Sequence, residues 1–191
     1  MMIKELVLKN RSFRRFYGDH VIERETLVEL IDLARHSASA ANRQPLKFYL
    51  SCDPETNAVI FPHTRWAGYL EDWGGPAVEE RPSAYIVILG DNKISETFSV
   101  DHGIAAQSIL LGAVERGLGG CMIGSVVRMK LQKELDLPDH LQILLVVALG
   151  KPRETVVIEP LGPDGNIKYW RDEAGVHHVP KRSLDELIVN P

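Results

Sequence analysis

Residues 103–116 constrain the fold more than any other part of the sequence. Their apolar side chains would surround a helix axis instead of forming one stripe along it. A helix that is apolar on nearly all sides is buried on nearly all sides. Its small residues would let neighbouring backbones approach closely: Gly103, Ala105, Ala106, Gly112 and Ala113. The sequence therefore predicts a helix that lies either in the core of one chain or at a contact between two subunits.

The other elements predict an α+β fold. Residues 141–149 form a continuous apolar run, which is typical of a central strand buried on both faces. Further strands are predicted at residues 46–52, 83–89 and 119–125, with a hairpin formed by residues 167–171 and 176–179. Further helices are predicted at residues 2–9, 22–36, 127–135 and 184–189. Because helices and strands do not alternate regularly, we expect a three-layer α+β arrangement in which a mixed, mainly antiparallel central sheet is flanked by helices.

Residues 63–81 follow no regular pattern. They contain Trp66, Tyr69 and Trp73 next to a Gly-Gly-Pro sequence. We expect an irregular loop or a broken helix here. No linker-like stretch divides the chain elsewhere, so residues 1–191 are predicted to form a single domain.

Composition narrows the class of protein. The net charge of −4 argues against a general nucleic-acid binder. No apolar run is long enough to span a membrane or to resemble a signal peptide. The two cysteines, Cys52 and Cys121, lie far apart and form no CxxC motif, which is typical of free thiols in a reducing compartment. We therefore expect a cytoplasmic protein that binds neither nucleic acid nor membrane.

Several familiar site motifs do not fit the sequence. The glycines within residues 117–120 follow a predicted helix and precede a strand, the reverse of the dinucleotide-binding fingerprint, and Met122 stands where the last glycine is needed. His177 and His178 are adjacent in a predicted strand, so their side chains point to opposite faces and cannot easily share a metal ion. No GxSxG motif is present. We therefore expect no metal site and no side-chain nucleophile.

Three polar stretches remain as candidates for a binding site. Residues 11–15 hold three arginines and a serine, residues 37–45 hold serine, asparagine and glutamine before a strand, and Lys181 and Arg182 stand near the end of the chain. Arginine is a preferred partner of phosphate, because its planar fork donates hydrogen bonds in pairs. Asparagine and glutamine both donate and accept, which suits the edge of a flavin or purine ring. Each stretch alone is also typical of a solvated surface.

Together, four stretches in order along the chain resemble the FMN-dependent nitroreductase family. Residues 11–16 (RSFRRF) are similar to its N-terminal Arg-Ser-x-Arg-x-Phe motif, and residues 37–45 (SASAANRQP) to its Ser-Ala-x-Asn-x-Gln-Pro loop. Residues 101–124 resemble its core helix and the following strand, and residues 179–184 (VPKRSL) resemble its closing Pro-Lys-Arg. The resemblance thus spans almost the whole chain.

The resemblance implies an FMN site. Arg11, Ser12 and Arg14 would contact the phosphate, the ribityl chain and the N1/O2 side of the ring. Asn42 would bond the ring edge or the ribityl chain, with Gln44 close by. Two further groups are implied, the backbone near ring N5 and the cations at the phosphate: Cys121, Met122, Ile123 and Gly124 for the first, and Lys181 and Arg182 for the second.

Two positions depart from the family pattern. Asn10 stands where the family often has a second arginine, which weakens the phosphate interpretation slightly. Leu46 stands where the family often has tryptophan after Gln-Pro, which would change packing only. Residues 64–81 match no family motif, and insertions at such places in the family often cover the flavin. Substrate choice could therefore lie in this segment.

The resemblance also implies an activity. NADH or NADPH would deliver hydride to flavin N5, and a small oxidised acceptor such as a nitroaromatic or a quinone would then take the electrons in ping-pong turnover. The flavin supplies the chemistry, so no catalytic side chain is nominated. The family works as a homodimer with flavin sites built from both subunits. Three alternatives stay open: a related flavin enzyme (dehalogenase, enoyl or azo reductase, flavin-fragmenting), a non-catalytic flavin carrier, and a structural domain without cofactor.

Overall fold

The computed structural model describes residues 2–190, and its central sheet is organised around β5 (Leu141–Pro152). Strand β5 pairs antiparallel with β3 (Ala84–Asp91), β4 (Gly119–Ile123) and β1 (Phe16–Tyr17), and β2 (Leu46–Ser51) extends the sheet beyond β3. All eight residues of β3 are buried. The continuous apolar run at residues 141–149 is therefore a central strand, as the sequence predicts.

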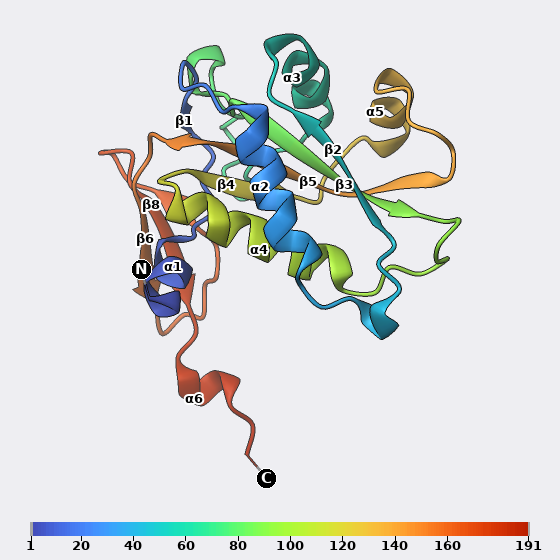
Figure 1. Cartoon of the computed structure of the whole chain (residues 1–191). Helices are drawn as coiled ribbons and strands as arrows, with labels where there is room; N and C mark the ends of the chain where they lie inside the picture. The colour runs from blue at the N-terminus through green and yellow to red at the C-terminus, as the bar shows by residue number, and fades with distance from the viewer. Residues whose placement is uncertain (1, 191) are drawn as a thin grey trace.

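Helices α2 (Arg24–Arg35) and α4 (Asp101–Glu115) cover one face of this sheet. The two helices are in close contact at Gly112, because a Cβ atom there would lie 2.4 Å from Cδ1 of Leu33 and 2.9 Å from Cδ2 of Leu30. The small residues of α4 thus let α2 pack directly on it while α4 rests on the sheet (Figure 1). Helix α4 is therefore largely buried within one chain.

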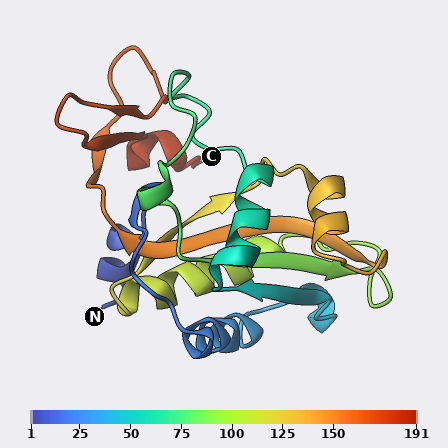
Figure 2. The ribbon, with the colours of Figure 1, turned by 90° about the horizontal axis from the view of Figure 1, so that it is seen from above.

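Helices α3 (Pro54–Ile60) and α5 (Arg128–Glu134) cover the other face of the sheet. Ile60 and Leu131 are fully buried there against β3 and β5. Figure 2 shows the sheet as the middle layer between the two pairs of helices. The predicted three-layer α+β fold with a mainly antiparallel central sheet is confirmed.

A second, smaller sheet stands beside the central one, close to the short helix α1 (Ile3–Lys9) (Figure 1). Strand β8 (His177–Lys181) lies in its middle, parallel to β6 (Val156–Pro160) and antiparallel to β7 (Trp170–Arg171). The short helix α6 (Leu184–Leu187) follows β8 and extends away from the rest of the chain (Figure 1). This small sheet brings residues near the end of the chain next to residues near its beginning, since Nε2 of His177 in β8 lies 3.1 Å from Nη1 of Arg14.

Most predicted elements occur within a few residues of their expected bounds. Residues 64–81 are largely irregular and end in a 3-10 turn at Val78–Glu80, as expected. The sequence interpretation missed α3, although Asp53 accepts from the backbone N–H of Thr56 and Pro54 occupies the first turn, which is a typical helix start. It also missed β6. No helix within residues 2–190 is long and apolar enough to cross a membrane.

Candidate functional site

The arginine-rich stretch lies beside the start of β4. Ser12 forms an isolated parallel bridge with Gly120, and the Phe13 backbone N–H donates to the Gly120 carbonyl at 3.0 Å. Gly119 leaves the space that the Phe13 ring fills, since a Cβ atom there would lie 2.5 Å from that ring. The glycines at the start of β4 thus let residues 11–15 approach the sheet closely, which explains why glycine is needed here without a dinucleotide site.

A cavity of about 350 Å³ opens between this stretch, α4 and the small sheet. Its walls come from both ends of the chain: Asn10, Arg11, Ser12, Arg14, Gln107, Leu110, Met122, Val156, Tyr169, His177, Val179 and Lys181. The structure therefore brings together five of the residues that the sequence nominated: Arg11, Ser12, Arg14, Met122 and Lys181. This cavity is the candidate active site.

The cations of this cavity lack carboxylate partners. Within residues 2–190, neither Arg11, Arg14 nor Lys181 forms an ion pair. Burial lowers the pKa of Arg11, and its Nε is buried without a hydrogen-bond partner. Uncompensated guanidinium and ammonium groups around one cavity form a site for an anion, and for phosphate in particular.

Arg14 is held in place by neighbours from the small sheet. Its Nη1 donates to the Ser12 carbonyl at 3.2 Å and to Nε2 of His177 at 3.1 Å, and its guanidinium lies 4.6 Å from the ring centroid of Tyr169. An arginine is always protonated and can only donate, so Nε2 of His177 must accept. Burial, and then the charges of Arg14 and Arg171, lower the pKa of His177 to about 4. His177 is therefore neutral and keeps its lone pair for Arg14.

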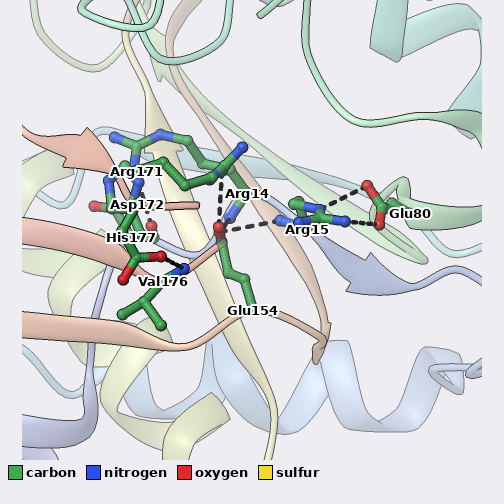
Figure 3. A network of polar contacts seen from close by, with 9 residues as sticks. Arg14, Arg15, Glu80, Glu154, Arg171, Asp172, Val176 and His177 are labelled. Atoms are coloured by element: carbon green, nitrogen blue, oxygen red, sulfur yellow. Dashed lines mark hydrogen bonds and ion pairs between the residues drawn. The ribbon is translucent and has the colours of Figure 1, made fainter. Parts of the chain in front are cut away.

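A buried carboxylate fixes the backbone of the same stretch. The Glu154 carboxylate accepts from the backbone N–H groups of Arg14 and Arg15, and from Nη2 of Arg171 at 2.9 Å (Figure 3). The Arg15 side chain turns the other way, to Glu80, with Nε at 2.7 Å. The Glu80 pairing lowers the pKa of Glu80 and raises that of Arg15. Arg15 is thus structural, whereas Arg14 faces the cavity.

The residues of β4 divide between the two faces of the sheet. Met122 lines the cavity, whereas Cys121 and Ile123 are buried in the core on the α3/α5 side. This alternation is the ordinary period of a strand. Burial raises the pKa of the Cys121 thiol, so this cysteine stays protonated. Gly124 is exposed at the end of β4.

Asn42 and Gln44, which the sequence predicts to be site residues, lie away from this cavity. Their loop is anchored at the start of α4, where Asp101 accepts from Oγ of Ser39 at 2.6 Å and from the backbone N–H of Ala40 at 3.0 Å. Gln44 lines a separate cavity of about 180 Å³, and Asn42 is exposed. Within one chain, this loop does not reach the cavity that Arg14 lines.

Arg182 also lies outside the cavity. It pairs with Glu186, with Nη1 3.2 Å from the carboxylate, along the exposed helix α6. Lys181, the residue before it, lines the cavity. The two cations therefore separate, although the sequence interpretation placed both at one phosphate.

The sequence interpretation missed the contributions of Tyr169, His177 and Val179. A signal for two of them was present: His177, Val179 and Lys181 alternate along β8, so a site at Lys181 includes all three on one face. Tyr169 carries no such signal, because it precedes the two-residue strand β7 in an irregular segment.

Comparisons with known proteins show what this chain is similar to. The chain is 26% identical over 204 residues to an NADH dehydrogenase of Thermus thermophilus, an alignment that covers 88% of this chain and 95% of that protein. It is 25% identical over 162 residues to an FMN reductase (NADPH) of Bacillus subtilis, covering 78% of this chain and 65% of that one. The crystal structure of a nitroreductase family protein from Clostridium novyi NT has the same fold, with a TM-score of 0.67, 24% identity and coverage of 97% and 99% of the two chains.

A family model also matches the chain directly. The model of the nitroreductase family matches residues 7–151, which include the arginine-rich stretch, α4 and nearly all of the central sheet. The small sheet and α6 lie beyond the matched part. The chain belongs to the nitroreductase family.

Proposed function

We propose that this protein is an FMN-dependent oxidoreductase that takes reducing equivalents from NAD(P)H and passes them to a small oxidised acceptor. One observation carries the proposal: Arg11, Arg14 and Lys181 converge on one cavity from opposite ends of an acidic chain, without acidic partners within residues 2–190. Relatives named NADH dehydrogenase and FMN reductase (NADPH) support a nicotinamide reductant and a flavin.

The residues at the cavity fit a flavin phosphate. A phosphate dianion needs more than one cation to offset its desolvation, and three are available here. The buried Nε of Arg11 has no hydrogen-bond partner within the described residues, so it is available to donate to an oxygen of a ligand. Arg11, Ser12 and Lys181 would hold the phosphate end, and Met122 and Leu110 would pack against apolar parts of the ligand.

Bound FMN would supply hydride and electron transfer between NAD(P)H and a nitroaromatic, a quinone or a similar acceptor in two successive half-reactions. The residues of the chain would bind the flavin and place positive charge beside it. Arg14 would place a fixed positive charge beside the ligand, and His177 and Tyr169 hold it there at low reorganisation cost. The segment at residues 64–81 reaches the same place, since the Tyr69 and Tyr169 rings pack with centroids 4.9 Å apart. It is therefore positioned to influence the choice of acceptor.

We further propose that the site is completed in a homodimer. Asn42 and Gln44 are separated from the cationic cavity within one chain, so a second copy is needed to bring the two predicted halves together. Helices α1, α2 and α4 expose apolar side chains suited to such a contact: Ile3, Val7, Leu8, Val28, Leu33 and Ile104. Light scattering on the purified protein tests this, and a monomer at micromolar concentration would refute it.

The deciding experiment is an absorbance spectrum before and after anaerobic addition of NADH or NADPH. Flavin bands that bleach on addition are the expected result. Bands that persist would identify a flavin carrier. The absence of bands after incubation with FMN would refute the proposal altogether. Acceptor panels of nitroaromatics, quinones, halogenated and enoyl compounds then assign the substrate class.

A further inference from the structure

A second cavity of about 380 Å³ lies on the opposite face of the central sheet and shares no lining residue with the candidate active site. It is enclosed by the loop after β1, by α3 and by the residues that lead into β3. A cavity of this size is within the usual range for small-ligand sites.

The cavity contains a cation without an acidic partner. Arg81 lines it, and within residues 2–190 no carboxylate lies within ion-pair distance of its guanidinium. Neither of the two preceding glutamates pairs with Arg81, because Glu80 accepts from Arg15 and Glu79 is exposed. The guanidinium instead lies 3.9 Å from the ring centroid of Phe61, and its Nε is buried without a hydrogen-bond partner. Its charge is thus held in one place but not neutralised.

Two hydroxyl groups stand beside this cation. Tyr85 is 1% exposed, lines the cavity and makes no side-chain hydrogen bond within the described residues. Burial raises the pKa of Tyr85, so its hydroxyl remains a donor over the physiological range. Oγ of Ser83 is also buried without a partner. Buried polar groups are nearly always satisfied, so the unpartnered Nε of Arg81 and Oγ of Ser83 at one cavity mark a place for a polar ligand.

The remaining walls are mostly apolar and set the shape of the ligand. Their apolar part is formed by Val21, Pro54, Ala58, Phe61, Val78 and Pro82, and His20 and Asn57 also line the cavity. One guanidinium balances one negative charge, whereas a phosphate dianion would be left with excess charge against apolar walls. We propose that this cavity binds a small monocarboxylate with an apolar, ring-sized body. Its carboxylate is held by Arg81 and Tyr85, and its body packs against Phe61 and the prolines.

Benzoate is the probe for this site, and benzamide is its uncharged match. Calorimetric titration of the whole protein is expected to show benzoate binding, with benzamide weaker by about tenfold or more, the scale of a charged hydrogen bond. Equal binding of the two compounds, or no binding of benzoate, would overturn the proposal.

Substitutions locate the binding. Arg81→Met keeps the stem and removes the charge, and is expected to weaken benzoate by about tenfold or more. Arg24→Met on the exposed face of α2 is the control and should leave it unchanged. Tyr85→Phe removes only the hydroxyl and is expected to weaken benzoate several-fold, so it decides the matter if Arg81→Met does not fold. Wild-type affinity for benzoate in either Arg81→Met or Tyr85→Phe would contradict the proposal.

Cys52 provides a reporter inside the cavity. Cys52 is a free, half-buried cysteine among the residues that line the cavity, whereas Cys121 is buried in the core. Saturating benzoate is expected to slow alkylation of Cys52 by iodoacetamide, measured by peptide mass spectrometry, and benzamide at the same concentration is not. An unchanged rate at saturating benzoate would place the ligand outside this cavity.

Discussion

The Glu154 carboxylate accepts a hydrogen bond from the backbone N–H of Arg14, which stands 140 positions earlier in the chain. Glu154 lies two residues before β6 of the small sheet, just beyond the part of the chain that the family model matches. Its side chain is 1% exposed and is balanced by Arg171. One buried carboxylate therefore joins the arginine-rich stretch to the segment that supplies Tyr169, His177 and Lys181.

The first prediction concerns this carboxylate. Glu154→Gln keeps the shape but turns an amide toward Arg171, which leaves that guanidinium without its charge partner. We expect a loss of about 2–3 kcal/mol in the free energy of unfolding, the scale of a charged hydrogen bond. Urea denaturation measures it. Glu173→Gln, at an exposed turn, is the matched control, and equal stabilities of the two variants would contradict the role of Glu154.

The second prediction concerns the cations of the candidate active site. Arg14→Ala and Lys181→Ala should each weaken FMN binding by about 1.5–3 kcal/mol, because each removes a charged donor. Fluorescence titration with FMN gives the affinities. Lys130→Ala, on the exposed side of α5, should leave them unchanged. If both cavity variants bind FMN as tightly as the wild type, the site assignment is wrong.

The fold could be predicted from the sequence because buried strands and helices have characteristic spacings of apolar residues. A run such as residues 141–149 is apolar at nearly every position only where a strand is covered on both faces, and α4 is apolar around its axis because α2 and the sheet enclose it. Helix α3 was missed because it has one fully buried residue, Ile60, and so carries almost no amphipathic pattern. Its start signal at Asp53 and Pro54 was the better guide.

The site was predicted in part. Motif residues such as Arg11, Arg14 and Lys181 meet at one cavity, but a motif does not state which neighbours orient it. Tyr169 and His177 reach Arg14 only because β8 runs parallel to β6 beside the arginine-rich stretch, and that pairing is long-range. Asn42 and Gln44 belong to the same set of family-like motifs but lie away from this cavity. The sequence pattern of one chain does not predict this separation.

The third prediction concerns pH. His178 lies between two carboxylates, with Nδ1 3.0 Å from Glu159 and Nε2 3.2 Å from Asp172. The hydrogen bonds to Asp172 and Glu159 raise the pKa of His178 above its usual 6.5, because only the imidazolium donates from both nitrogens. The stabilisation that protonated His178 gives the folded state is complete below pH 6.5. It is lost as the pH rises through the raised pKa of His178 in the folded state.

Thermal unfolding across this range checks the effect. The wild-type Tm should fall from pH 6.5 upward relative to that of His178→Gln, whose pair of carboxylates no longer faces a titrating group. His140→Gln, at a residue without a side-chain hydrogen bond in the described part of the chain, should keep the wild-type dependence. Parallel curves for the wild type and His178→Gln would show that the bridge contributes nothing.

The fourth prediction uses two glycines of the same helix. A Cβ atom added at Gly103 would have no neighbouring atom within 4 Å, whereas a Cβ at Gly112 would overlap Leu30 and Leu33 of α2. Gly103→Ala should therefore gain up to about 1 kcal/mol of stability from helix propensity. Gly112→Ala has the same propensity gain but must displace the fully buried Leu30, so we expect a net loss of about 1–2 kcal/mol. Urea denaturation compares the two directly. If Gly112→Ala were as stable as Gly103→Ala, α2 and α4 would not be in close contact at this point, and the small residues of α4 would need a reason other than the approach of α2.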